Sequence, residues 1–166
     1  MGFFGDLIDA FIGSPAEAQI YKDAKLKSGM TGGRPALHRT DIDLNQKEPW
    51  GLHRTNLERM KIGWGPLDKN NQTIELHHIG QKPNSPLAEL RYNEHRGSGN
   101  SGILHSKNSQ GSEFYGKNNR NQWKKEQKQY WKDRAAGYSN SNNSSIADGI
   151  SSLFEGIANL FEAFTK

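Results

Sequence analysis

The sequence predicts a small α+β domain flanked by helices. Two short stretches, residues 73–81 and 87–90, have the composition and the turn-forming neighbours of β-strands, and residues 118–136 have the composition of a helix. Hydrophobic residues make up only 33% of the chain, and the mean hydropathy is −0.91. A chain of 166 residues fits one domain. Its hydrophobic core must be small for that length.

Charge and cysteine content narrow the classes of function. The formal charge of +4 and the isoelectric point near 9.3 agree with a polyanionic partner, although many unrelated domains share such values. The chain has no cysteine. This excludes a disulfide framework and a thiolate metal site, so any metal ion must be held by His, Asp, Glu or Asn.

The sequence shows no sign of a membrane span. It has no run approaching the roughly 18 apolar residues of a spanning helix. Residues 1–13 lack the basic start of a signal peptide. We therefore expect no membrane span and no cleavable signal peptide, in a chain that is soluble or exported by another route.

Apolar residues at helical spacing mark both ends of the chain. Residues 1–30 are predicted to form an amphipathic helical segment with a break at Ser14. Residues 146–166 are predicted to form a longer amphipathic helix, and the Ser- and Asn-rich residues 137–145 a linker. The main domain is then residues 31–136.

The terminal helices allow two interpretations. Either they pack on the domain or on each other, or they mediate self-association or bind a delivery partner. Insertion into a membrane surface is disfavoured because the polar face of the C-terminal helix is acidic, with Asp148, Glu155 and Glu162. The sequence leaves the role of these helices open.

The main domain begins with a Gly-rich loop at residues 28–35, followed by an irregular polar stretch. Thr55 is placed to cap a short helix that contains Leu57 and Met60. A turn at residues 64–72 leads into the first strand. The second strand then runs into a short helical turn with His95.

Four histidines indicate a metal site beside a proton acceptor. His77 and His78 are neighbours in the first strand, so they point to opposite faces and have different roles. His95 and His105 follow in a polar, Gly-rich context that no apolar periodicity explains. One histidine of the pair can bind a divalent ion that keeps an open position, while the other takes a proton from water. The alternative is that one of the pair only forms a hydrogen bond in the core.

Four short motifs together carry a resemblance to a known family. They are "NLERM", "ELHHIGQ", "EHRG" and "ILH". From about Leu37 to Ala136 the sequence resembles the LHH family of the HNH/endonuclease VII superfamily. The resemblance implies a ββα-metal core that binds one divalent metal ion, such as Zn, Mg, Mn or Ni.

The resemblance also implies roles for single residues. The first histidine of the pair, His77, becomes a metal ligand, and the second, His78, becomes the general base. The later histidines of the family fall on His95 and His105, which are the candidates to complete the metal site. Two further candidates lie close in sequence, Glu75 and Asn93.

Domains of this family commonly form the C-terminal toxin of bacterial polymorphic toxins. The resemblance therefore implies a delivered effector that acts in the cytoplasm of competing bacterial cells, with a cognate immunity protein as partner. Most of the superfamily cleaves DNA. DNA is thus favoured over RNA as the substrate, although no residue decides between them.

The predicted basic helix has charges interleaved with aromatic residues. Between residues 117 and 134, seven Lys or Arg against two acidic residues give a local excess of +5. Trp123, Tyr130 and Trp131 share one helix face, so we expect them in the core and the charges outside. The candidates for contact with nucleic acid are Lys124, Lys128, Lys132 and Arg96.

The sequence thus predicts a metal-dependent endonuclease, with one alternative. In the alternative, the chain is a non-catalytic nucleic-acid-binding module whose histidines hold a structural metal ion. A structural site is closed by four protein ligands, whereas a catalytic site keeps a position for water or phosphate. The remaining histidines, His38 and His53, are each followed by Arg and are expected on the loop surface.

Overall fold

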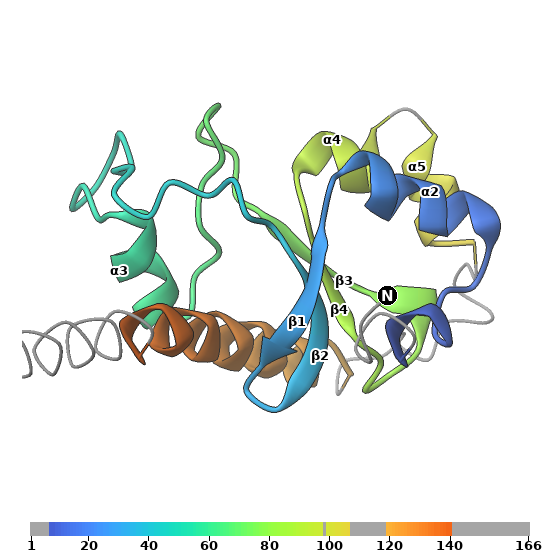
Figure 1. Ribbon diagram of the computed structural model, residues 1–166. Coiled ribbons are helices and arrows are strands. Elements are labelled where there is room, and N and C mark those ends of the chain that lie inside the picture. The colour runs from blue at the N-terminus through green and yellow to red at the C-terminus, as the bar shows by residue number, and fades with distance from the viewer. Residues whose placement is uncertain (1–6, 98, 107–118, 141–166) are drawn as a thin grey trace, which may run out of the picture.

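Four strands form the sheet at the centre of the fold (Figure 1). They are β1 (Lys27–Thr31), β2 (Arg34–His38), β3 (Glu75–His78) and β4 (Leu87–Leu90). The computed structural model describes residues 7–97, 99–106 and 119–140. The strand order is β1-β2-β4-β3, in which only the β2–β4 pair is parallel. This order leaves β3 at one edge of the sheet.

Both strands predicted from the sequence are present. β4 has the predicted bounds, whereas β3 covers only the middle of the predicted stretch 73–81. The chain leaves β3 through a single 3₁₀ turn, η1 (Ile79–Gln81), in which Gly80 has a φ of 69°. This conformation favours glycine, which has no Cβ to clash with the backbone. The strand therefore ends directly after the two histidines.

The prediction of a Gly-rich loop at residues 28–35 is wrong. These residues lie in the β1–β2 hairpin, where Thr31 pairs with Arg34 across a two-residue turn. Gly32 and Gly33 have φ values of 56° and 77°, as tight hairpin turns require. The boundary expected between residues 30 and 31 falls inside β1.

Side-chain caps define where two helices begin. The Thr55 hydroxyl accepts a hydrogen bond from the Glu58 N–H at 3.2 Å, and the Glu58 carboxylate accepts one from the Thr55 N–H at 2.7 Å. This capping box confirms the predicted start of α3 (Asn56–Lys61). Ser14 caps α2 (Pro15–Asp23) in a similar way. Two short helices follow β4, α4 (Tyr92–Arg96) and α5 (Asn100–Leu104).

The basic helix is longer than predicted. It includes residues 119–140, so residues 137–140 continue the helix where the sequence predicted the start of a linker. Side-chain contacts hold this last turn: Tyr138 packs on the core, and the Ser139 hydroxyl donates to the Ala135 carbonyl at 3.3 Å. The rest of the predicted linker and the predicted helix 146–166 lie outside the described residues, as do residues 1–6. None of the described helices has the length and apolar character needed to cross a membrane.

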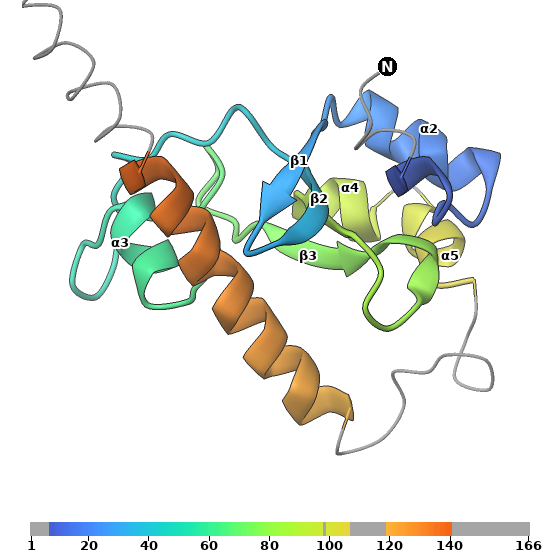
Figure 2. The same cartoon turned by 60° about the horizontal axis from the view of Figure 1, so that its bottom comes forward.

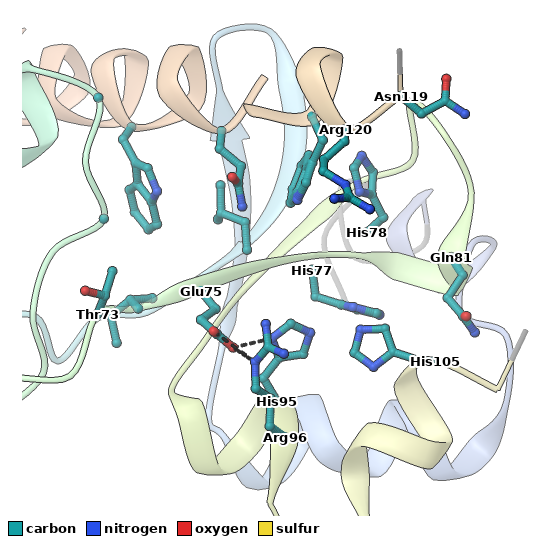
Figure 3. Close-up of a pocket in the computed structure, with 17 residues that line it drawn as sticks. Thr73, Glu75, His77, His78, Gln81, His95, Arg96, His105, Asn119 and Arg120 are labelled. Atoms are coloured by element: carbon teal, nitrogen blue, oxygen red, sulfur yellow. Dashed lines mark hydrogen bonds and ion pairs between the residues drawn. The ribbon is translucent and has the colours of Figure 1, made fainter. Parts of the chain in front are cut away.

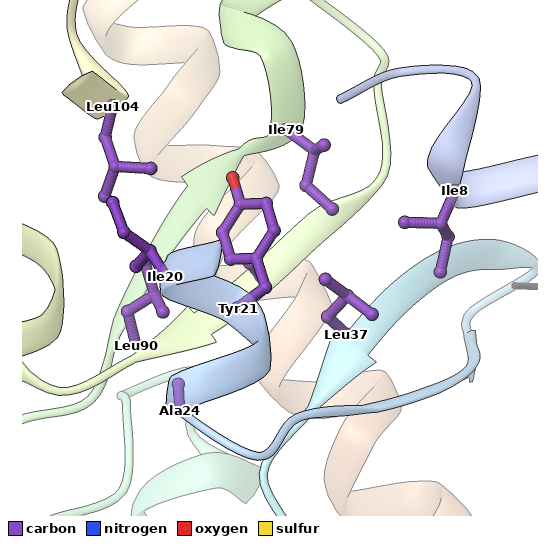
Figure 4. Packing of buried hydrophobic residues seen from close by; sticks show 9 residues of the cluster. Ile8, Ile20, Tyr21, Ala24, Leu37, Ile79, Leu90 and Leu104 are labelled. Carbon is purple, nitrogen blue, oxygen red and sulfur yellow. The ribbon is translucent and has the colours of Figure 1, made fainter. Parts of the chain in front are cut away.

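One hydrophobic cluster joins the N-terminal segment to the sheet. Ile20 and Tyr21 of α2 are buried, and Ile8 is only 1% exposed. These side chains pack with Ile79 and Leu104 (Figure 4). The described part of the N-terminal segment therefore packs on the main domain.

The 119–140 helix lies along the sheet (Figure 2). A second cluster of buried residues lies between this helix and the sheet, on the face opposite the first cluster. Tyr130 and Trp131 are 4% and 3% exposed and pack with Met60 and Leu76. Trp123 is partly buried at the margin of this cluster. The prediction that the aromatic residues of the basic helix lie in the core is confirmed for Tyr130 and Trp131.

A buried carboxylate fixes the 119–140 helix over the sheet. Glu89 of β4 is fully buried and accepts hydrogen bonds from the Tyr130 hydroxyl at 2.8 Å and from Arg134 Nε at 2.9 Å. It also accepts one from the Arg39 backbone N–H at 2.7 Å. A buried charge with several donors is stabilised, whereas the loss of one partner leaves it uncompensated. The network therefore connects the 119–140 helix to the sheet.

His38 lies in β2 and is half-buried, contrary to the expected position on the loop surface. Its Nε2 is 2.8 Å from the Thr31 hydroxyl oxygen. Burial, and then the charge of Arg134, lowers the pKa of His38 from 6.5 to about 4. Below pH 6.5, His38 binds a proton in the unfolded chain, but in the folded chain it stays neutral until the pH falls to about 4. The contribution of His38 to stability is therefore present above pH 6.5 and lost as the pH falls through about 4.

Replacing His38 with Gln is expected to flatten the fall in unfolding free energy between pH 6.5 and 4. Urea denaturation of the metal-free chain at a series of pH values measures this. His53→Ala, at an exposed loop position, is the control and should keep the wild-type profile. An unchanged profile for His38→Gln would show that this ring takes up its proton equally in the folded and the unfolded chain.

Candidate metal centre and its cleft

A cavity of about 520 Å³ follows the outer edge of β3, between the 119–140 helix and the helices α4 and α5 (Figure 3). All residues from 73 to 78 line it. Successive strand residues point to opposite faces, so they can line one cavity only where it passes around an edge. The position of β3 at the edge of the sheet provides this geometry.

Three histidines meet on one side of β3. His77 comes from the strand, His95 from α4, and His105 follows α5. One nitrogen of each ring lies within 4.8 Å of the others. The ring centroids are 4.9 to 5.3 Å apart, and the side chains converge on a common point (Figure 3). These spacings allow the three rings to bind a single ion.

Hydrogen bonds orient two of these rings. His95 Nδ1 is 2.6 Å from a carboxylate oxygen of Glu75, which also accepts from Arg96 Nε at 2.9 Å. His105 Nδ1 is 3.1 Å from the Ser101 carbonyl oxygen. An acceptor at Nδ1 places the proton there, so the lone pair of each ring is on Nε2. Such outer contacts fix the tautomer and orientation of metal-binding histidines.

The environment of His77 keeps its ring neutral. It is 4% exposed, and burial lowers its pKa to about 4, although the nearby Glu17 carboxylate acts in the opposite direction. Glu17 Oε1 is 3.8 Å from His77 Nε2. The same carboxylate accepts hydrogen bonds from the Gly80 N–H at 2.8 Å and the Tyr21 hydroxyl at 2.6 Å. A neutral imidazole near pH 7 retains the lone pair that a metal ion needs.

The three rings fit a metal ion by their donor chemistry. The Nε2 atoms of His77 and His95 are buried and have no hydrogen-bond partner among the described residues. Buried polar atoms in proteins are nearly always paired, so the lack of a partner at these two atoms agrees with a bound ion. Three imidazoles also leave at least one coordination position open. Of the other two candidates, Glu75 contacts His95, whereas Asn93 is exposed and does not line the cavity.

His78 lies on the other face of β3 but lines the same cavity. It is 6% exposed, and its Nε2 is 3.2 Å from Glu126 Oε2. The ring packs against the Trp123 ring with centroids 4.3 Å apart. The adjacent histidines thus have different partners, as the strand alternation predicts.

The 119–140 helix lines the cavity with residues other than the predicted lysines. Arg120 and Gln127 line it, together with Trp123 and Trp131. Their spacing of three, four and seven residues places them on one helix face, a pattern present in the sequence. Of the predicted nucleic-acid contacts, Arg96 lines the cavity, while the three lysines are exposed and do not. These lysines are Lys124, Lys128 and Lys132.

Replacing Glu75 with Gln is expected to lower metal affinity about 10- to 100-fold. A neutral amide holds the His95 Nδ1–H less strongly than a carboxylate does, so the ring loses basicity and orientation. Calorimetric titration with Zn²⁺ measures the change. Asp23→Asn, which removes one negative charge at an exposed position outside the cavity, is the control. Equal affinity of Glu75→Gln and wild type would show that Glu75 does not support the site.

A family model agrees with this arrangement. The model describes a nuclease of the HNH/ENDO VII superfamily with conserved LHH, and it matches residues 55–137. The three letters fall on Leu76, His77 and His78. No solved structure matches the chain. The mixed sheet and helices are consistent with an HNH-like core. Because the match covers half of the sequence, the chain belongs to the LHH family of HNH/ENDO VII superfamily nucleases.

Proposed function

We propose that the protein is a metal-dependent endonuclease that hydrolyses phosphodiester bonds of nucleic acid, with DNA favoured over RNA. One observation carries this proposal. The three-histidine cluster and His78 lie on opposite faces of β3, yet they line one cavity around its edge. A phosphate in this cavity would contact both the metal site and a proton acceptor.

In this proposal, His77, His95 and His105 hold one divalent cation. The ion, when bound, supplies positive charge that stabilises the charge developing on the phosphate and on the leaving oxygen. The ring tautomers set by Glu75 and by the Ser101 carbonyl keep two lone pairs directed at the site. The chain therefore provides a preorganised site for the ion.

The proton chemistry is assigned to His78. Its ring takes a proton from a water molecule as the water oxygen attacks phosphorus, and the bond from phosphorus to the leaving oxygen breaks. Arg120 lies beside His78 at the cavity (Figure 3) and provides charge for the phosphate oxygens. The leaving oxygen takes its proton from solvent.

The biological setting is proposed from the resemblance to polymorphic toxin domains. We assign the protein as a delivered effector that cleaves nucleic acid in the cytoplasm of competing bacteria, countered by a cognate immunity protein. Residues 146–166 would serve association or delivery. Expression in a bacterial cytoplasm should arrest growth, and the His78→Ala variant should not. Growth arrest by both would contradict a nuclease toxin.

The predicted lysines on the 119–140 helix should contact the nucleic-acid backbone beyond the cavity. We expect the triple change of Lys124, Lys128 and Lys132 to Gln to reduce the salt slope of binding by about 0.9 per lost contact on duplex DNA. Fluorescence anisotropy across a salt series measures the slope. Changing Lys22, Lys25 and Lys27 to Gln removes the same charge at exposed positions outside the cavity and serves as control. Equal slopes for the two triple variants would exclude a backbone contact on this helix.

The alternative is a non-catalytic nucleic-acid-binding module with a structural metal ion. A closed structural site needs four protein ligands, and the described residues supply a cluster of three beside a cavity. The test is incubation with plasmid DNA and with RNA, before and after chelation and metal return. We expect cleavage that stops with chelator and resumes with metal. Tight binding without cleavage of either substrate would favour the alternative.

A further inference from the structure

Glu126 contacts the ring of His78 from the 119–140 helix. Its two carboxylate oxygens are 3.3 and 3.2 Å from His78 Nε2. It is one of two acidic residues in the described part of that helix, the other being Asp133. His78 and Glu126 both line a second, small cavity.

A second contact fixes the carboxylate itself. Arg34 of β2 forms an ion pair with Glu126. The Arg34 guanidinium is in turn held by the Ser85 carbonyl oxygen, which accepts from Nε at 2.8 Å. The Glu126 carboxylate thus contacts Arg34 of β2 and His78 of β3. Glu126 is one-quarter exposed, so its position depends on these partners more than on packing.

The ring of His78 is limited in its rotation as well. Trp123 lies one helical turn before Glu126 and packs against the ring at 4.3 Å between centroids. A carboxylate acceptor at Nε2 places the ring proton on that nitrogen, and the lone pair is then on Nδ1. Trp123 restricts the plane of the ring, and Glu126 favours the tautomer with the proton on Nε2.

We propose that Glu126 is a positioning residue for His78, and that it keeps the lone pair of the general base on Nδ1. This rests on the proposed function, in which His78 takes the proton from water. The family match begins at residue 55, so Arg34, the residue that holds Glu126, lies outside it. Because Arg34 lies in β2, the role of Glu126 depends on the β1–β2 hairpin.

A double-mutant cycle tests the proposal. Glu126→Met, His78→Ala and the double variant are compared in single-turnover cleavage with enzyme in excess, after thermal melts show that each is folded. Glu126→Met is expected to slow cleavage about 10- to 100-fold in the wild-type background, with unchanged Zn²⁺ affinity, but less than about 2-fold in the His78→Ala background. Asp133→Met, the matched change on the same helix, should leave the rate unchanged.

The outcomes separate this inference from the proposed function. If Glu126→Met slows both backgrounds equally, or slows neither while His78→Ala is impaired, the positioning role is overturned and the base assignment stands. If His78→Ala cleaves at the wild-type rate, the base assignment fails and the role of Glu126 fails with it. Nitrogen-15 NMR of the imidazole gives a second readout. We expect the Nε2–H tautomer for His78 in the wild type, and the Nδ1–H tautomer would also overturn the proposal.

Discussion

Replacing His78 with Ala is expected to slow phosphodiester cleavage about 100- to 10,000-fold. The expected loss is that of a general base, because the proposed role of this ring is to take the proton of the attacking water. Metal affinity should stay near the wild-type value, since His78 points to the opposite face of β3 from the three-histidine cluster. The variant therefore separates the proton chemistry from the metal site.

Single-turnover cleavage and calorimetric titration with Zn²⁺ measure the two quantities on one preparation. His53→Ala is the matched control, because His53 is exposed on a loop and does not line the cavity. A His78→Ala variant that has lost metal affinity along with activity would place this histidine among the ligands. Cleavage at the wild-type rate would remove it from the mechanism.

Replacing His95 with Ala is expected to remove most of the metal affinity. The change deletes a ligand nitrogen, so the loss of affinity should exceed the roughly 10- to 100-fold that changes in outer contacts cost. A ligand at 100 times its Kd stabilises a folded protein by about 2.7 kcal/mol. Wild type should therefore melt at a higher temperature with metal added, and His95→Ala should show almost no shift.

In the melting experiment, His53→Ala is the control and should show the full wild-type shift in melting temperature with metal. Cleavage by His95→Ala should also be lost at metal concentrations that saturate the wild type. An equal melting shift in His95→Ala and wild type would mean that the ion binds elsewhere.

Local patterns in the sequence predicted much of the site. The two-residue period of a strand predicts different surroundings for His77 and His78, and the structure gives them Glu17 and Glu126 as neighbours. The capping signal at Thr55 likewise located α3. These features depend on residues close together in the chain, so a pattern of a few residues contains them.

Long-range pairing could not be predicted in the same way. Glu17 reaches Gly80 across 63 residues, and β2 pairs in parallel with β4 although α3 and β3 lie between them in the chain. Neither contact leaves a local signal. The β1–β2 hairpin was missed because a pair of glycines is compatible with a loop as well as with a two-residue turn. In the sequence, Glu126 is one of two acidic residues in a basic helix, and no local pattern indicates its contact with His78.

A crystal structure of the Zn²⁺-loaded protein, with anomalous scattering at the zinc edge, tests the three-histidine metal site directly. We expect one ion bound by nitrogens of His77, His95 and His105 at about 2.0 to 2.1 Å, with the remaining coordination position facing the cavity and filled by water or an anion. An ion closed off by a fourth protein ligand, or an ion bound away from these three rings, would contradict this expectation.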